Sequence, residues 1–275
     1  MKKSIISLFT LTAFVLFMTS CGGKKAKEDE AKAEEAAVVA GQVSKSLLTE
    51  EVKAETILLL KDMPSSEIPY RIATGEVTIN VGDTKFMLPL SKSSELTSNS
   101  QKARVCGMYF ADYFVLKAMK QKTTELEIVL AKLAADLNIA FMVDILKETA
   151  PEGASKEEYA KFLQAQESRI FTEMANGDRV DVQIELLSGV LAESACVYSD
   201  PSLVVKGDAT SAGLSDNMVR RLEILKEVIA DLATYYPNLE ELGQTISPLD
   251  DKITTINIAR SSNAEIIGIR NALLK

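Results

Sequence analysis

The stretch VCGMYFADYFVLKAM, residues 105–119, and the stretch LLSGVLAESACVY, residues 186–198, decide the fold of this chain. Only Asp112 and Lys117 carry a charge in the first stretch, and only Glu193 carries one in the second. Helices of this composition have no wide polar face to turn toward water, so we expect them to be the central pair of a bundle. Each also carries a row of small residues, which lets two helix axes approach closely, and we predict that the two helices pack on each other. The rows are Ala103, Gly107, Ala111 and Ala118 on one helix, and Ser188, Gly189, Ala192 and Cys196 on the other.

Helical spacing of apolar residues continues on both sides of this pair, from about Val43 to the end of the chain, and only residues 76–89 alternate weakly like a strand. The sequence therefore predicts an all-α multi-helix bundle, with residues 43–275 as a single helical domain. The expected helices cover residues 47–62, 66–74, 101–121, 124–137, 140–149, 156–175, 180–198, 216–235 and 248–274.

Helix starts are marked by a hydroxyl followed three residues later by a carboxylate, because the two side chains satisfy free N–H groups of the first turn. A serine followed by proline marks a further start. In the helix expected over 216–235, apolar residues form one stripe, and charged residues lie opposite. The starts are Thr124 with Glu127, Ser155 with Glu158, Ser262 with Glu265, and Ser247 with Pro248; the stripe is Met218, Leu222, Leu225, Ile229 and Leu232, opposite Arg220, Arg221, Lys226 and Asp231.

The N-terminus has the pattern of a bacterial lipoprotein signal. Lys2 and Lys3 precede a mostly apolar run over residues 5–18, which at 1.5 Å per residue spans roughly 21 Å and is too short for a membrane core of about 30 Å. Residues 18–21, MTSC, resemble a lipobox, which implies removal of residues 1–20 and acylation of Cys21 with chains such as palmitate. An ordinary signal peptide with a chance cysteine is the alternative. Residues 21–42, rich in Lys, Glu and Ala, read as the lipidated cysteine and a flexible tether.

Charge and the residues after Cys21 suggest where the protein lies. The chain of 275 residues has 31 Lys+Arg and 39 Asp+Glu, and loss of Lys2 and Lys3 would change the formal charge from −8 to −10. An acidic chain has no attraction to phosphate, so we expect no nucleic-acid partner. Residue 22 is Gly, whereas an Asp directly after the lipidated cysteine retains lipoproteins in the inner membrane of enteric bacteria. This difference favours the outer membrane. Residues 27–30, KEDE, resemble an export signal of some Bacteroidetes lipoproteins, and both the periplasm and the cell surface remain open.

Four elements in the middle of the chain resemble a known family. Residues 64–68 are similar to a PSPxEI element, residues 107–112 to a GVYxAD helix, and residues 132–139 to a kLadxLgI segment. Gly189 and Glu193 lie where an AGGWIE helix would place them. In this order the elements resemble an uncharacterised family of helical Bacteroidetes lipoproteins. The resemblance implies a helical fold and an envelope location, and it implies no activity.

Composition excludes several classes of enzyme. The chain has no His, which removes Ser-His-Asp triads, Cys-His proteases and histidine-ligated zinc and di-iron sites. Residues 215–217, SDN, match one element of penicillin-interacting enzymes, but no S-x-x-K accompanies them, so they predict a helix cap. Nucleotide-binding glycine loops, CxxC and acidic calcium loops are also missing from the sequence. We expect no cofactor and no metal, and the sequence identifies no catalytic residue.

Asp112 and Glu193 are the sharpest candidates for a binding site. An ionised carboxylate in an apolar helix costs several kcal/mol unless it is paired, and its burial raises its pKa. The two carboxyls either bind the polar end of a ligand or a cation, or accept structural hydrogen bonds. At 100° per residue, Asp112 lies about 140° around the helix from Gly107, and Glu193 lies about 40° from Gly189, so the two carboxyls need not face each other.

Two tyrosines and two cysteines complete the candidates. Tyr109 and Tyr113 are four residues apart and stack along one helix face, as core residues or as a platform for a ligand. Cys106 and Cys196 are the thiols left once Cys21 is lipidated. In an oxidising compartment they either form a disulfide between the central helices or remain buried thiols.

The sequence favours a lipid-anchored envelope protein that binds a small ligand or another envelope protein without catalysis. One alternative is an envelope enzyme that uses Asp112 or Glu193 with a tyrosine. Another is a purely structural component of the envelope. An interior cavity lined by both carboxyls would favour the enzyme, whereas a solid core with an exposed apolar patch would favour a protein partner.

Overall fold

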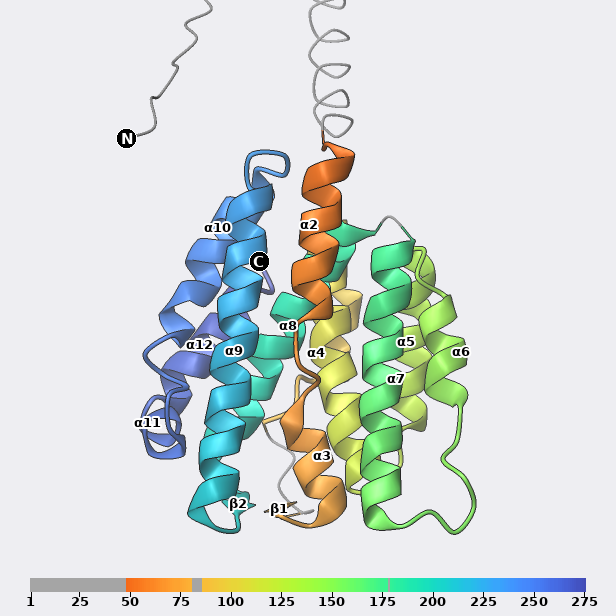
Figure 1. The fold of residues 1–275 in the computed structure, drawn as a ribbon, viewed down its shortest axis with the longest axis vertical. Helices are drawn as coiled ribbons and strands as arrows, with labels where there is room; N and C mark the ends of the chain where they lie inside the picture. The colour runs from red at the N-terminus through yellow and green to blue at the C-terminus, as the bar shows by residue number, and fades with distance from the viewer. Residues whose placement is uncertain (1–47, 81–85, 178) are drawn as a thin grey trace, which may run out of the picture. The chain divides into compact units, whose positions relative to one another are not determined.

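The computed structural model describes residues 48–80, 86–177 and 179–275, and these residues form one compact unit. The predicted signal peptide, Cys21 and the tether over 21–42 lie outside the described residues. Within them the fold is an all-α bundle with one small two-stranded sheet, as the helical spacing predicts (Figure 1). None of the helices in these ranges has the length and apolar character needed to cross a membrane.

The elements keep the labels of Figure 1. The sheet pairs β1 with β2 in antiparallel register, with Val77 opposite Val205. In chain order the elements are α2 (Glu50–Lys61), α3 (Glu67–Thr74), β1 (Val77–Ile79), the 3-10 helix η1 (Leu90–Ser94), α4 (Asn99–Ala118), α5 (Thr124–Asp136), α6 (Phe141–Lys147), α7 (Lys156–Asn176), α8 (Val180–Ser199), β2 (Leu203–Val205), α9 (Asp208–Leu232), α10 (Asn238–Ile246), the 3-10 helix η2 (Ser247–Leu249), α11 (Ile256–Ser261) and α12 (Asn263–Ala272).

Helices α4 and α8 form the centre of the bundle, as their apolar sequences predict, and most of their residues are buried. A Cβ atom added to Gly107 would lie 1.9 Å from the carbonyl oxygen of Leu186, and one added to Gly189 would lie 1.9 Å from that of Arg104. The two backbones are therefore in direct contact, and only glycine fits at either position. The predicted packing through small residues is confirmed.

The central pair is parallel, with a constant offset in sequence. Arg104 on α4 donates from Nε to Oε2 of Glu185 on α8 at 2.6 Å. Eight residues further along each helix, Asp112 on α4 meets Glu193 on α8. Residues 81 positions apart in the chain thus lie side by side along this pair, which fixes the geometry of the site described below.

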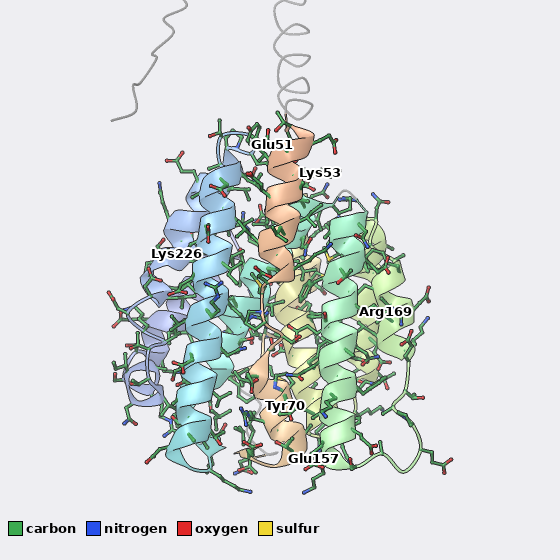
Figure 2. All side chains as sticks on the ribbon, viewed as in Figure 1. Glu51, Lys53, Tyr70, Glu157, Arg169 and Lys226 are labelled. Carbon is green, nitrogen blue, oxygen red and sulfur yellow. The ribbon has the colours of Figure 1, made fainter. Side chains whose placement is uncertain are left out.

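The other helices surround this pair. Helices α9–α12 lie on one side of it and α5–α7 on the other (Figure 1). Helix α3 contacts α4, α7 and α9, and so bridges the two groups. Side chains on the outer faces, such as Glu51, Glu157 and Arg169, are exposed and point away from the bundle (Figure 2). The apolar stripe predicted for the outer helix α9 is buried as expected.

A buried ion pair joins α7 and α9 to the segment before α3. Glu167 on α7 accepts hydrogen bonds from the Ser66 backbone N–H at 2.8 Å and from Nη1 of Arg221 at 3.0 Å. Arg221 also donates to Oγ of Ser66 at 2.6 Å. The prediction that Arg221 belongs to the polar face of its helix was wrong, because it is only 3% exposed. Its charge is compensated by Glu167, which makes burial tolerable.

Several predicted helix boundaries differ from the structure. Helix α9 begins at Asp208, so residues 215–217 lie within it and do not form the predicted cap. Ser215 instead donates from Oγ to the carbonyl of Ser211 at 3.1 Å and shares a hydrogen bond with the hydroxyl of Tyr198 at 2.5 Å. The helix expected over 248–274 is divided into η2, α11 and α12, and α10 precedes it.

The predicted helix starts are confirmed in part. Ser155 and Glu158 form the reciprocal capping box at the start of α7. Helix α5 begins at Thr124, but its cap is Thr123, whose Oγ1 donates to Oε1 of Glu127 at 2.7 Å. Ser262 precedes α12 without a capping hydrogen bond from its side chain. The weak alternation over residues 76–89 corresponds to β1, with only three residues in the strand.

Candidate functional site

Asp112 and Glu193 meet at the interface of α4 and α8. The sequence left their relative direction open, and the parallel pairing of the two helices brings the carboxyls into contact. Both side chains are buried, with 2% of Asp112 and none of Glu193 exposed. The two strongest candidates from the sequence are therefore one cluster.

Arg270 on α12 completes this cluster. Its Nη1 donates to Oε1 of Glu193 at 3.1 Å and to the carbonyl oxygen of Phe86 at 2.6 Å. The backbone N–H of Leu88 donates to Oδ2 of Asp112 at 3.2 Å. Among the described residues, no N–H or hydroxyl group donates to Oδ1 of Asp112, although this atom is buried. One carboxyl oxygen in the cluster is thus left without a conventional donor.

The two carboxyls differ in how strongly each holds a proton. Burial raises the pKa of Asp112 well above its ordinary 3.8, and the nearby charge of Glu193 raises it further. Burial also raises the pKa of Glu193, but the charge of Arg270 and its hydrogen bond oppose the rise. Two carboxyls form a hydrogen bond with each other only when one of them carries a proton. We therefore assign a proton to Asp112, which donates to an ionised Glu193 held by Arg270.

Asp112 also lines a pocket that opens to solvent. The pocket has a volume of about 610 Å³, within the range of roughly 300–1,000 Å³ that holds small molecules. Its lining is mostly apolar, with three exposed polar side chains that come from the start of α5 and the residues before it. Glu193 is not part of the lining, so Asp112 is the one residue of the two that contributes to the wall of the pocket. The lining residues are Met87, Leu88, Pro89, Leu90, Asp112, Leu116, Lys122, Thr124, Glu125 and Leu126.

The two candidate tyrosines have different positions. The hydroxyl of Tyr109 donates to the carbonyl oxygen of Pro89 at 2.9 Å, which holds one wall of the pocket against α4. The hydroxyl of Tyr113 donates to the carbonyl oxygen of Leu146 at 2.8 Å, toward α6. Both tyrosines are buried, and neither lines this pocket. Tyr109 supports a wall of the pocket and Tyr113 packs toward α6, so both occupy core positions, the first of the two alternatives.

Cys106 and Cys196 are both free and buried, so the predicted alternative of a disulfide was wrong. The parallel pairing explains this, because the offset of 81 residues places Cys196 level with Val115. Cys106 lies nine residues earlier, about 13 Å along the axis at 1.5 Å per residue. A disulfide requires Cα atoms within about 7 Å of each other. Burial raises the pKa of the Cys106 thiol to about 12.

Arg270 and the segment over residues 87–90 were not among the site residues predicted from the sequence. A signal for Arg270 exists, because Ile266 lies four residues before it and Leu273 lies three residues after it, and both are buried. This spacing places Arg270 on the buried face of its helix, where a charge needs a partner. The segment over 87–90 has no comparable signal, since its position depends on contacts with α4.

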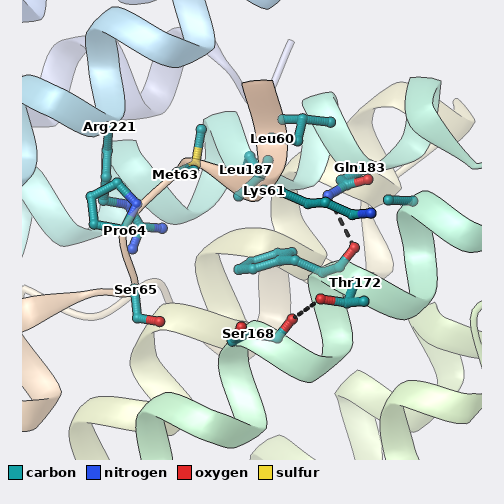
Figure 3. Close-up of a pocket in the computed structure, with 12 residues that line it drawn as sticks. Leu60, Lys61, Met63, Pro64, Ser65, Ser168, Thr172, Gln183, Leu187 and Arg221 are labelled. Carbon is teal, nitrogen blue, oxygen red and sulfur yellow. Dashed lines mark hydrogen bonds between the residues drawn. The ribbon is translucent and has the colours of Figure 1, made fainter. Parts of the chain in front are cut away.

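A second cavity lies beside Arg221, between α2, α7 and α8 (Figure 3). Its volume is about 70 Å³, enough for a few water molecules. Gln183 donates from Nε2 to the carbonyl oxygen of Phe171 at 3.2 Å, and its buried Oε1 has no donor among the described residues. A polar cavity of this size with an open acceptor is suited to bound water and not to a larger ligand.

No group of three or more His, Cys, Asp or Glu side chains is placed to hold a metal ion in the part of the chain that the structure describes. No protein-family model, curated protein or solved structure matches the chain. The pocket at Asp112 and the charged cluster behind it are therefore the features from which a function can be proposed.

Proposed function

We propose that the chain is a lipid-anchored protein of the bacterial outer membrane that binds a small, mostly apolar molecule and catalyses no reaction. The lipobox-like residues 18–21 and the apolar run before them support the anchor, and Gly22 supports the outer membrane. The pocket of about 610 Å³ with the Asp112 carboxyl in its wall supports ligand binding. This pocket is the observation that carries the proposal.

The chemistry of the wall favours a ligand with one polar group. Oδ1 of Asp112 is a buried oxygen to which no N–H or hydroxyl group of the described residues donates, and a buried acceptor in this state costs about 1–3 kcal/mol. A ligand that donates a hydrogen bond to Oδ1 of Asp112 would remove this cost. The apolar side chains of Leu88, Leu116 and Leu126 would cover the remainder of the molecule. The pocket thus combines an apolar wall with one site of specific recognition.

The arrangement supports binding more than acid–base catalysis. Catalysis by a pair of carboxyls requires both to reach the substrate. Both oxygens of Glu193 contact Nη1 of Arg270, and Glu193 does not line the pocket. The hydroxyl of Tyr109 is already bonded to Pro89. Asp112 is therefore the one member of this cluster that a bound molecule would meet.

A protein partner is less well supported than a small ligand. In the described ranges, the large apolar side chains with the highest exposure lie singly on four different elements. An interface for a protein normally requires a contiguous apolar area of several hundred Å². These side chains are Leu58 on α2, Ile128 on α5, Val204 on β2 and Ile258 on α11.

Thermal unfolding with hexan-1-ol as a neutral, water-soluble probe tests the proposal. The full chain is purified in mild detergent, and its Tm is measured with and without the alcohol. At ten times its Kd, the probe should stabilise the protein by about 1.4 kcal/mol and raise the Tm by about 3–6 °C. Leu116→Trp should reduce the rise, because the larger side chain occupies part of the pocket wall beside Asp112.

Ile128→Trp is the matched control, because Ile128 is 67% exposed on α5 and lies outside the pocket. This variant should keep the full rise in Tm. If hexan-1-ol leaves the Tm of the wild-type protein unchanged, or shifts wild type and Leu116→Trp equally, the pocket is not the binding site and the proposal fails.

A further inference from the structure

The buried cluster behind the pocket contains two carboxyls and one guanidinium. Asp112, Glu193 and Arg270 are each at least nine-tenths buried, so water screens their charges poorly. If both carboxyls were ionised, the cluster would carry one uncompensated negative charge. A proton on Asp112 removes this charge in the empty pocket. With both carboxyls ionised, the cluster therefore needs one more positive charge, and Oδ1 of Asp112 is the carboxyl oxygen to which no N–H or hydroxyl group of the described residues donates.

We propose that the pocket binds a monovalent amine, a molecule whose protonated amino group is attached directly to an apolar body, and that the ammonium group takes the place of the proton on Asp112. This inference rests on the proposed function, because it assigns the ligand of the same pocket. The ammonium group donates to Oδ1 of Asp112, and Arg270 continues to hold Glu193. Each buried carboxylate then has its own cation.

The charge balance among Asp112, Glu193 and Arg270 also disfavours ligands with other polar groups. A carboxylate ligand would bring a further negative charge against Asp112 and Glu193, which no group in the cluster offsets. A zwitterionic lipid head group would bring a phosphate into the same site. A neutral alcohol leaves the proton on Asp112 and gains only a hydrogen bond. The walls formed by Leu88, Leu116 and Leu126 favour an apolar body next to the amino group.

Binding of the amine releases one proton, from the Asp112 carboxyl to the solvent. The groups that face Asp112 are Glu193 and Cys196 on α8, Arg270 on α12 and Tyr109 on α4, with Lys122 and Glu125 at the opening. Lys122 and Glu125 are exposed, of opposite charge and screened by water. An alkylamine stays protonated below a pH of about 10, like the side chain of Lys. Its affinity should therefore increase with pH, by up to about tenfold per unit while Asp112 holds its proton in the free protein.

The experiment compares hexylamine, hexan-1-ol and hexanoate, which share one apolar body, on the full chain in mild detergent. Kd values are measured by calorimetry at pH 6, 7 and 8. We expect hexylamine to bind at least about tenfold more tightly than hexan-1-ol at pH 8, and we expect hexanoate to bind most weakly. Proton release on binding, measured in two buffers of different ionisation enthalpy, should approach one proton for hexylamine and zero for hexan-1-ol.

Three variants distinguish the effect of the buried carboxyls from that of the exposed carboxylate of Glu125. Asp112→Asn removes the site of exchange, and Glu193→Gln leaves one carboxyl for one guanidinium, so both should bring hexylamine and hexan-1-ol to within about twofold of each other. Glu125→Gln removes the exposed carboxylate at the opening and should keep the preference. The two buried variants are independent, so a folding defect in one leaves the other as the test.

The outcomes separate this inference from the proposed function. If hexan-1-ol binds the wild-type protein as tightly as hexylamine, with no dependence on pH, the pocket binds ligands but the assignment of an amine is wrong. A preference for hexylamine that disappears in Glu125→Gln and persists in Asp112→Asn would also overturn it. If none of the three probes binds, or if Leu116→Trp binds them as the wild type does, the proposed function fails with it.

Discussion

Gly107→Ala tests the contact between α4 and α8, on which both the fold and the site depend. The new methyl carbon would lie 1.9 Å from the carbonyl oxygen of Leu186 and 3.0 Å from the backbone nitrogen of Val190. These atoms belong to the backbone of α8, so no side chain can rotate away to make room. The two central helices must separate by more than about 1 Å to restore an ordinary contact.

The magnitude follows from the packing that this separation would disrupt. A gap of about 0.5–1 Å already removes a quarter to a half of the dispersion energy of a contact. Forcing an extra methyl group into a packed core typically costs about 1–3 kcal/mol, and here the rigid backbone places the effect at the upper end. We expect Gly107→Ala to lower the free energy of unfolding by about 3 kcal/mol or more, and the Tm by about 6–12 °C.

Gly268→Ala is the matched control. Gly268 lies on α12, and a Cβ atom added there would meet no other atom within 4 Å. Alanine replaces glycine in a helix in both variants, and the exposed site should gain about 0.5–1 kcal/mol from the better helix propensity. Urea unfolding of the full chain, followed by circular dichroism, measures both variants against the wild type.

Gly189→Ala extends the test to the other side of the contact, where the added carbon would lie 1.9 Å from the carbonyl oxygen of Arg104. Either substitution alone forces the same two helices apart, so the loss in the double variant should be smaller than the sum of the single losses. If Gly107→Ala is as stable as Gly268→Ala to within about 0.5 kcal/mol, the close crossing of α4 and α8 is incorrect. The offset that brings Asp112 to Glu193 would then lose its support.

Three further predictions concern the carboxyl cluster, the thiols and the anchor. The folded protein keeps a proton on Asp112 that the unfolded chain releases above its ordinary pKa of 3.8, so this group stabilises the fold at low pH and the effect is lost as pH rises. Relative to the wild type, Asp112→Asn should gain up to about 1.4 kcal/mol per pH unit between pH 5 and 7 in urea unfolding, and a parallel pH dependence of the two proteins would contradict the assigned proton. Burial raises the pKa of Cys106 to about 12 and raises that of Cys196 as well, so a thiol reagent should label neither in the native protein and both in urea; rapid native labelling would show that they are accessible. Cys21→Ala should move the protein from the membrane fraction to the soluble fraction, and retention of the variant in the membrane would exclude lipidation at Cys21 as the anchor.

The central helices could be predicted from the sequence because their signal is local. A helix with one or two charges in 13 to 15 residues has no stable exposed position, so its place in the centre follows from composition alone. The glycines at 107 and 189 also had a local meaning, since small residues in a row permit close approach. The boundaries of α9 and α12 were predicted less well. Their starts have no capping hydrogen bond from a side chain, so the sequence contains no corresponding signal.

The charged side chains inside the bundle required information that no single segment contains. Arg221 follows Met218 by three residues and precedes Leu225 by four, and Arg270 follows Ile266 by four residues and precedes Leu273 by three. Their spacing places both arginines on buried helix faces, where an unpaired charge would cost several kcal/mol. A sequence can therefore indicate that such an arginine has a carboxylate partner.

The identity of that partner is a property of the folded chain. Glu167 lies 54 residues from Arg221, and Glu193 lies 77 residues from Arg270. Either arginine would be compensated by either carboxylate, and only the arrangement of α7, α8, α9 and α12 selects the pairs. The same arrangement leaves Asp112 without a cation of its own beside the pocket. The proposed preference for an amine thus arises from how the helices distribute charge, which is why Asp112 was a candidate in the sequence and its ligand was not.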